Sequence, residues 1–330
     1  MSEGIRSHRI FFIVNKYSGG GRAGSWWRSA LPILEQQGLD FFWQYSEGGA
    51  ATSAQVRRAV LEENATAVLA VGGDGHMHDI VNGLIAEDKL LREGLVYGVY
   101  PAGSGCDFAR MLFKNGKNNN INGLLELLFN GQLLPIDVGR ADFFGSDGEG
   151  RRTYFINGSD IGLGAETAWR VNARDGFLKR LLKNGQLAFF VAAMQALLAY
   201  KYLPMRIEAD GENLDGQYLI AAAGNGRYMG GNMCLFPRAK LDDGLLELLL
   251  VGKMPKIRAL RLFAKVYNGT VLEIKEVCYR QSRNVSLVPD KPLPLELDGE
   301  LPGFTPLNIC VLPQILPLLV FAQDDSPPRA

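Results

Sequence analysis

The chain has few of the residues that build disulfide scaffolds or metal centres. Its 330 residues include only four cysteines and three histidines. The cysteines (Cys106, Cys234, Cys278 and Cys310) lie far apart and form no CxxC pair. Their spacing argues against a zinc ribbon and a disulfide framework, and it favours a reducing, cytoplasmic environment. So few histidines leave little for histidine-based metal or acid–base chemistry.

An excess of charge and a long apolar run are also missing. Lys plus Arg and Asp plus Glu number 35 each, so the formal net charge is zero and no global basic field favours nucleic acid as a partner. The longest apolar stretch, residues 187–200, falls short of the ~20 residues that span a bilayer. The N-terminus lacks the apolar core and cleavage site of a signal peptide. We therefore expect a soluble protein that contacts membranes only at their surface.

Glycine is the residue in excess, with 39 of 330 positions, or about 12%. Clusters at 19–21, 72–75 and 103–105 each follow an apolar run that predicts a strand. Over the first 135 residues such strands alternate with helical patterns, which predicts a doubly wound parallel sheet. Ligands bind such sheets beyond the carboxyl ends of their strands. The three loops together predict a site for the phosphates of a nucleotide.

The second loop, Gly72–Gly75, contains the acid Asp74 and precedes a helical pattern. Glycine lets the backbone approach an anion, and the N–H groups at a helix start favour phosphate. Asp74 cannot hold phosphate without a cation, so it indicates either Mg²⁺ binding or proton handling. The alternative is a strand–turn–helix corner in which Asp74 only caps the helix.

From about Leu134 onward the pattern changes to strand-like alternation with Asp-Gly pairs, which are strong hairpin signals. Two of these pairs are Asp210-Gly211 and Asp298-Gly299. The second half therefore predicts an antiparallel β domain, interrupted by a helical region from about Ala165 to Tyr200.

Five segments, in order, match one family. They are IVNKYSGGGRA (13–23), VGGDGHMHDIVNGL (71–84), YPAGSGCDFAR (100–110), AAAGNGRYMGGNMCLFPRAKLDDGLLELLLV (221–251) and LELDGE (295–300). They resemble the signatures of the diacylglycerol kinase catalytic-domain superfamily, which includes bacterial diacylglycerol and YegS-like lipid kinases, sphingosine kinases and ceramide kinases. The resemblance covers about residues 9–312.

The resemblance implies two domains. Residues 1–134 would form the α/β ATP-binding domain, of NAD-kinase or phosphofructokinase type, with 312–330 returning to it. Residues 135–311 would form an antiparallel β-sandwich that binds lipid. The implied activity is ATP-dependent phosphorylation of a lipid hydroxyl, with a role in lipid metabolism such as phospholipid biosynthesis.

The implied cofactors are ATP and Mg²⁺. We assign ATP binding to the three glycine loops: Asn15, Ser18, Gly72, Gly73, Asp74, Gly75, His76, Gly103, Ser104 and Gly105. The resemblance places Mg²⁺ at the segment that contains Lys240, Asp243 and Leu245, with Asp243 as its side-chain ligand. Carboxylates and water are oxygen ligands that Mg²⁺ prefers.

Phosphoryl transfer to an alcohol also needs help with the hydroxyl proton, because an alcohol is a poor nucleophile. The resemblance implies Glu300 as the general base. Asp74 competes for this role, and the sequence does not separate the two. The position matching Glu166 lies near the lipid head group in sphingosine kinases, which implies a substrate contact.

Two residues depart from the family pattern. His76 stands where members commonly have Thr, and we interpret it as a tolerated residue at a helix start. Cys106 stands where the family normally has Asn, and a thiol is a weaker hydrogen-bond partner than an amide. Two alternatives to a lipid kinase therefore stay open: a soluble-substrate kinase of the NAD kinase type, and a catalytically silent regulator that binds lipid or nucleotide.

A basic segment that includes Lys179, Arg180 and Lys183 precedes the apolar run 187–200. Basic and apolar segments side by side suit an anionic membrane surface or a lipid tail pocket. The alternative is a buried helix with a solvated basic flank. With the resemblance in view, we predict a lipid-facing helix and peripheral membrane association. The lipid, of diacylglycerol or sphingoid type, and the oligomeric state, a homodimer included, stay open.

Overall fold

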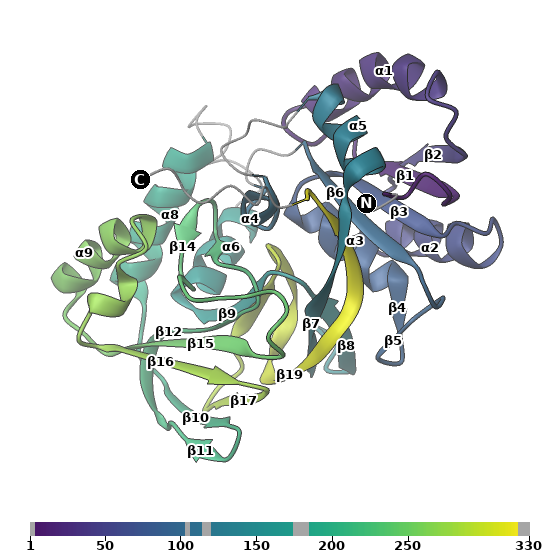
Figure 1. The fold of residues 1–330 in the computed structure, drawn as a ribbon. Helices are drawn as coiled ribbons and strands as arrows, with labels where there is room; N and C mark the ends of the chain where they lie inside the picture. Colours follow the sequence, from purple (N-terminus) through teal and green to yellow (C-terminus); the bar gives the residue numbers. More distant parts are fainter. Residues whose placement is uncertain (1–3, 103–105, 114–119, 174–184, 323–330) are drawn as a thin grey trace. The chain divides into compact units, whose positions relative to one another are not determined.

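The computed structural model describes residues 4–102, 106–113, 120–173 and 185–322 (Figure 1). The chain forms two compact units. The first contains the residues up to Ile136 and those from Gln314 onward, and the second runs from Asp137 to Pro313. The long last strand, β19 (Glu300–Val320), is yellow in Figure 1 and has residues in both units.

The first unit is built on a parallel sheet. Its strands in spatial order are β2 (Phe41–Tyr45), β1 (Ile10–Val14), β3 (Ala67–Gly72), β6 (Val96–Pro101) and the end of β19. Its helices are α1 (Arg22–Glu35), α2 (Gly49–Leu61), α3 (Asp74–Leu84), α4 (Ala109–Leu112) and α5 (Ile121–Asn130). A short hairpin, β4 (Ile85–Ala86) and β5 (Lys89–Leu90), follows α3. The predicted α/β fold is confirmed for this part of the chain.

Burial explains the composition of the central strands. Every residue of β1, β3 and β6 is buried, because a parallel sheet is covered on both faces and its strands are apolar throughout. In the pairing, Val14 lies beside Val71, and Val71 lies beside Tyr100. The carboxyl ends of these three strands therefore meet at one edge of the sheet, which brings the loops that follow them together.

The second unit is antiparallel, as predicted. Strands β9 (Gly158–Gly162), β12 (Gly216–Gly224), β10 (Pro204–Ala209), β17 (Asn284–Pro289), β19 and β18 (Pro294–Leu297) pair in this order, and β18 pairs again with β9. The hydrogen bonding thus closes into a ring around an apolar core, a closure that the sequence did not predict. The other strands are β7 (Gln132–Phe144), β8 (Gly150–Phe155), β11 (Glu212–Asn213), β13 (Tyr228–Met229), β14 (Met233–Cys234), β15 (Leu246–Gly252) and β16 (Val277–Ser282).

Helices cover the outside of this ring. Strand β15 is therefore buried, and it has apolar residues on both faces. Leu248 and Leu250 belong to the core inside the ring. Leu249 and Val251 belong to a second cluster, shared with helices α6 (Leu163–Ala173), α8 (Gly185–Ala199) and α9 (Lys256–Tyr267). A short turn of 3₁₀ helix, Val271–Glu273, adds to this cluster.

The helical region predicted from about Ala165 to Tyr200 thus contains α6 and α8. The basic residues Lys179, Arg180 and Lys183 lie outside the described part of the chain. Among the described helices, none is both long enough and apolar enough to cross a membrane.

Candidate functional site

The β3–α3 turn contains the Gly-Gly-Asp-Gly sequence. Gly72 ends β3, Gly73 is the cap residue, and helix α3 begins at Asp74 rather than after Gly75, where the sequence pattern predicts it. Asp74 and Gly75 are therefore a helix start and not a loop. The first N–H groups of a helix have no carbonyl partner within it, so this end of α3 favours a phosphate.

Asp74 connects this turn to the loop after β6. Its Oδ2 accepts the backbone N–H of Asp107 at 3.0 Å, and its Oδ1 accepts that of Phe108 at 3.1 Å. The side chain thereby caps the residues that precede α4. Both carboxylate oxygens thus accept hydrogen bonds, and Asp74 fixes the loop after β6 against the β3–α3 turn.

The loop after β1 contains Asn15 and three consecutive glycines, which set its backbone conformation. The Asn15 Oδ1 accepts the N–H of Tyr17 at 3.1 Å, and the Asn15 carbonyl accepts the N–H of Ser18 at 3.1 Å. Gly19, Gly20 and Gly21 have φ values of 62°, 69° and 90°, a left-handed conformation that side chains disfavour. Asn15 and Ser18 thus lie at the sheet edge where α3 begins. Gly103, Ser104 and Gly105, the third predicted loop, lie outside the described residues.

The His76 side chain belongs to the core. It is 5% exposed, and its Nε2–H donates to the carbonyl of Ile13 at 3.1 Å. Burial lowers the pKa of His76 to about 4, although the hydrogen bond to Ile13 raises it, so the ring is neutral. Only the backbone N–H of His76 is left for the predicted ATP site. The Cys106 thiol donates to the carbonyl of Gly72 at 3.5 Å. The backbone φ of Cys106 is 51°, in the left-handed region.

In the second unit, a two-residue hairpin presents Glu300. Asp298 and Gly299 have φ values of 50° and 91°, and Leu297 pairs with Glu300 across the turn. The Asp298 carboxylate is buried and accepts three backbone N–H groups, from Ile156 at 3.0 Å, Asn157 at 2.9 Å and Gly158 at 3.0 Å. Glu300 is exposed, and its side chain has no hydrogen bond or ion pair within the described chain.

The acidic turn at 240–245 is attached to the buried Asp137. The Asp137 N–H donates to the carbonyl of Leu241 at 2.6 Å, and the Gly244 N–H donates to Asp137 Oδ2 at 2.7 Å. Within the turn, the Leu245 N–H donates to Asp243 Oδ1 at 3.2 Å. The turn therefore has a fixed shape, with Asp243 half-buried.

The donors of this turn fit Mg²⁺. The Asp243 carboxylate and the carbonyl groups of Lys240 and Leu245 are hard oxygen ligands. Nowhere in the described ranges do three or more His, Cys, Asp or Glu residues form a metal-binding group. A site with one carboxylate suits Mg²⁺, which keeps several of its waters and takes further ligands from phosphates.

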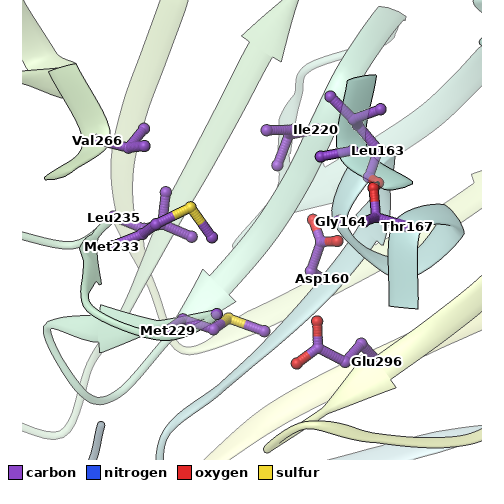
Figure 2. A pocket seen from close by; sticks show the side chains of 12 residues that line it. Asp160, Leu163, Gly164, Thr167, Ile220, Met229, Met233, Leu235, Val266 and Glu296 are labelled. Carbon is purple, nitrogen blue, oxygen red and sulfur yellow. The ribbon is translucent and has the colours of Figure 1, made fainter. Parts of the chain in front are cut away.

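The second unit also contains an apolar pocket with two acids (Figure 2). Its volume is about 60 Å³, and Asp160 and Glu296 line it together with Leu163, Gly164, Thr167, Ala193, Ile220, Met229, Gly230, Met233, Leu235 and Val266. Figure 2 shows the acids on neighbouring strands, with Met229, Met233 and Leu235 across from them. Neither acid was predicted as a site residue, although Glu296 stands between Leu295 and Leu297 of a strand, which was a usable signal.

Glu166, the predicted substrate contact, does not line this pocket. It lies on α6 and forms an ion pair with Arg170 one turn along, at 2.7 Å. The Arg170 Nε also donates to Glu166 Oε1 at 2.8 Å. Arg170 therefore compensates the charge of Glu166.

Comparison with known proteins agrees with these features. The diacylglycerol kinase catalytic domain matches residues 9–141, and the YegS C-terminal NAD kinase beta sandwich-like domain matches residues 157–320. Diacylglycerol kinases of Staphylococcus aureus strains JH9 and Newman are each 28% identical over 296 residues, covering 90% of this chain and 86% of theirs.

Solved structures share the fold. The crystal structure of a diacylglycerol kinase from Bacillus anthracis str. Sterne covers 95% of this chain and 97% of its own, with 19% identity and a TM-score of 0.68. A second crystal structure from that organism has the same coverage, with 20% identity and a TM-score of 0.71.

Together these matches define a class of protein, one with a kinase-type catalytic domain followed by a β domain. Both family models match in order and together cover most of the chain. The chain belongs to the YegS-like group of the diacylglycerol kinase family.

Proposed function

We propose that the protein transfers the γ-phosphoryl group of ATP to a hydroxyl group of a lipid. The observation that carries this proposal is the match to the two family domains over residues 9–141 and 157–320. The N-terminal end of α3, at the edge of a parallel sheet, supports a phosphate site. The apolar pocket of the second unit supports an acceptor with an aliphatic part.

We assign the general base to Glu300 and a positioning role to Asp74. Glu300 is exposed on a hairpin whose backbone is anchored through Asp298, so its carboxylate is accessible to a hydroxyl proton. Asp74 uses both oxygens to accept backbone N–H groups, so it supports the nucleotide site by holding the loop at Asp107 against the β3–α3 turn.

When bound, MgATP supplies the phosphoryl group, and the metal neutralises charge on its oxygens. In this proposal the Asp243 carboxylate and the carbonyl groups of Lys240 and Leu245 hold the metal. The N–H groups at the start of α3 bind phosphate, and Asn15 and Ser18 contribute polar groups at the same sheet edge. Glu300 accepts the proton of the lipid hydroxyl as it attacks.

The proposal is tested by transfer of radiolabelled γ-phosphate from ATP to a lipid panel in mixed micelles, with and without Mg²⁺. The panel contains diacylglycerol, monoacylglycerol, ceramide and a sphingoid base. A labelled lipid that requires Mg²⁺ is the expected result. Label in a soluble acceptor such as NAD would support the soluble-substrate kinase instead. Nucleotide binding without turnover on any acceptor would support the silent regulator.

The roles of the two acids are separated by Glu300→Gln and Asp74→Asn. Loss of a general base lowers kcat and removes the acidic limb of the pH profile, with little change in the KM for ATP. Loss of a positioning residue raises the KM for ATP and leaves the shape of the pH profile unchanged. The opposite pattern would reverse the assignment.

A further inference from the structure

A single buried amide joins the supports of the two acidic turns in the second unit. Asn225 directly follows β12 and is fully buried. Its Nδ2 donates to the carbonyl of Asp137 at 2.9 Å and to the carbonyl of Ile156 at 3.0 Å. Only the nitrogen of the amide can serve here, because both partners are carbonyl oxygens and an amide oxygen carries no proton. The two protons of the Nδ2 group are thus both used.

One of the two carbonyl groups belongs to the residue that fixes the turn at 240–245. The Asp137 N–H donates to the carbonyl of Leu241 at 2.6 Å, and Asp137 Oδ2 accepts the N–H of Gly244 at 2.7 Å. Asp137 is fully buried, where an unpaired polar group costs free energy. The position of the Asp137 backbone therefore sets the position of the turn, and Asn225 fixes that backbone.

The other carbonyl group belongs to the segment that anchors the hairpin of Glu300. The Ile156 N–H donates to Asp298 Oδ2 at 3.0 Å. The backbone N–H of Asn225 donates to the carbonyl of Asn157 at 2.8 Å, and the Asn157 N–H donates to Asp298 Oδ1 at 2.9 Å. The main chain and the side chain of Asn225 thus both support the segment to which the hairpin is bonded.

The amide oxygen of Asn225 indicates which atoms of the side chain matter. Its Oδ1 is buried and has no hydrogen-bond partner among the described residues. An unpaired buried oxygen costs free energy, and an aliphatic side chain of similar size would avoid that cost. The contribution of Asn225 therefore lies in the two donors of its Nδ2 group.

We propose that Asn225 is a positioning residue for phosphoryl transfer, which holds the turn of Asp243 and the hairpin of Glu300 at a fixed separation. Transfer needs the metal-bound phosphate and the base in one geometry, and a misplacement of about 1 Å can cost 10²-fold in rate. Asn225 supplies this constraint through the supports of the turns, since its printed bonds go to Asp137 and Ile156. The inference rests on the proposed function for the roles of the two acids.

The test is a pair of measurements on Asn225→Leu, a variant of similar side-chain volume that lacks the donors. Calorimetric titration of the full chain with Mg²⁺, without nucleotide, reports on the turn at 240–245. The initial rate of phosphoryl transfer reports on the hairpin. We expect the Kd for Mg²⁺ to rise roughly 10-fold, as for loss of an outer-shell partner, and kcat to fall roughly 10²-fold. The KM for the acceptor should stay within about 2-fold, because residue 225 does not line the apolar pocket.

Thr305→Val is the matched control, because Thr305 is a buried residue of the same unit whose hydroxyl accepts the N–H of Leu293 at 2.9 Å. This variant should also lower the thermal midpoint, but it should keep the wild-type Kd for Mg²⁺ and kcat. Asp298→Ala releases only the hairpin, so it should lower kcat and keep the Kd for Mg²⁺.

A change in only one of the two quantities in Asn225→Leu would overturn the inference, since the amide would then support one turn alone. Equal losses in Thr305→Val would overturn it as well, and so would a wild type that binds no Mg²⁺. Asn225→Ser replaces the leucine variant if that variant does not fold. The serine hydroxyl has one proton and can bond to at most one of the two carbonyl groups, so wild-type values of both quantities there would also overturn the inference.

The Mg²⁺ titration and the lipid panel fail independently. If a lipid is phosphorylated but Asn225→Leu keeps the wild-type Kd and kcat, the positioning role is wrong and the proposed function stands. If no acceptor is phosphorylated but Asn225→Leu loses Mg²⁺ affinity, the support of the turn at 240–245 stands and the proposed function is wrong.

Discussion

Two hairpins of the second unit carry the same tripeptide, Asp-Gly-Glu. One joins β10 to β11 and contains Asp210, Gly211 and Glu212. The other joins β18 to β19 and contains Asp298, Gly299 and Glu300. Their turn geometry is nearly the same, since the two aspartates have φ values of 48° and 50° and the two glycines 86° and 91°. Any difference between them comes from their surroundings.

The surroundings differ at both acids. Asp210 is exposed and accepts the N–H groups of Arg283 and Asn284, whereas Asp298 is buried and accepts those of residues 156–158. Glu212 forms an ion pair with Arg280 at 3.3 Å, whereas no ion pair of Glu300 is found within the described ranges. The same local sequence thus makes a solvated turn in one place and an anchored turn with a free acid in the other.

The largest expected difference between the hairpins is in catalysis. Glu300→Gln should lower the rate of phosphoryl transfer by roughly 10²–10⁴-fold, the usual contribution of a general base. Glu212→Gln should leave the rate within about 2-fold, because it only loses an exposed ion pair. Initial rates with the acceptor found in the lipid panel measure both. Equal losses would show that the hairpins do not differ in function.

The next difference is in stability. Asp298→Ala leaves three buried backbone N–H groups without their acceptor and should cost about 3 kcal/mol. Asp210→Ala exposes its donors to water and should cost about 1 kcal/mol. At roughly 2–4 °C per kcal/mol, the thermal midpoints of the two variants should separate by several degrees. Midpoints that coincide would contradict the anchoring role of Asp298.

Asp160 and Asp210 should respond to pH with opposite signs. Burial raises the pKa of Asp160 from 3.8 to about 7, so the folded chain binds this proton more tightly than the unfolded chain. Its contribution to stability is present in full below pH 3.8 and is lost as the pH rises toward 7, at up to about 1.4 kcal/mol per pH unit. Asp160→Asn should therefore lose less stability than the wild type between pH 5 and 8.

Burial also tends to raise the pKa of Asp210, but hydrogen bonds from Arg283, Asn284 and Ser282 together lower it. Its contribution is present above pH 3.8 and is lost only as the pH falls below that value. Asp210→Asn should leave the pH dependence between 5 and 8 unchanged. Thermal midpoints across this range measure both variants, and a wild-type slope in Asp160→Asn would be inconsistent with the raised pKa.

The smallest expected difference between the hairpins is at their glycines, Gly211 and Gly299, where substitution should have the same effect in both. A Cβ added at Gly211 or Gly299 meets no atom within 4 Å, so only the left-handed backbone opposes Ala. Each Gly→Ala variant should lower the free energy of unfolding by roughly 1–2 kcal/mol, and by the same amount in both turns. Urea titration of the pair measures it. A clearly larger cost at one turn would show that their backbones are not equivalent.

Much of the fold follows from local patterns. The alternation of apolar runs with helical segments predicts the parallel strands β1, β3 and β6, and Asp-Gly pairs predict hairpins that the structure contains. The start of α3 was misplaced, because two glycines around Asp74 resemble a loop although the backbone there is already helical. The closed ring of strands had no local signal, since it depends on pairing between distant segments.

The candidate site divides in the same way. Glycine neighbours marked Asp74 and Asp298 in the sequence, because glycine is typical of turns, and the resemblance to the family implied Asp243 and Glu300 as site residues. Only the tertiary structure decided that Asp74 caps another loop, that His76 turns into the core, and that Asp160 lines a pocket beside Glu296. Backbone conformation depends on near neighbours in the chain, whereas burial and hydrogen-bond partners come from segments that only folding brings together. For this reason the sequence by itself determined where the turns are, and the tertiary structure determined which of their acids are free to act.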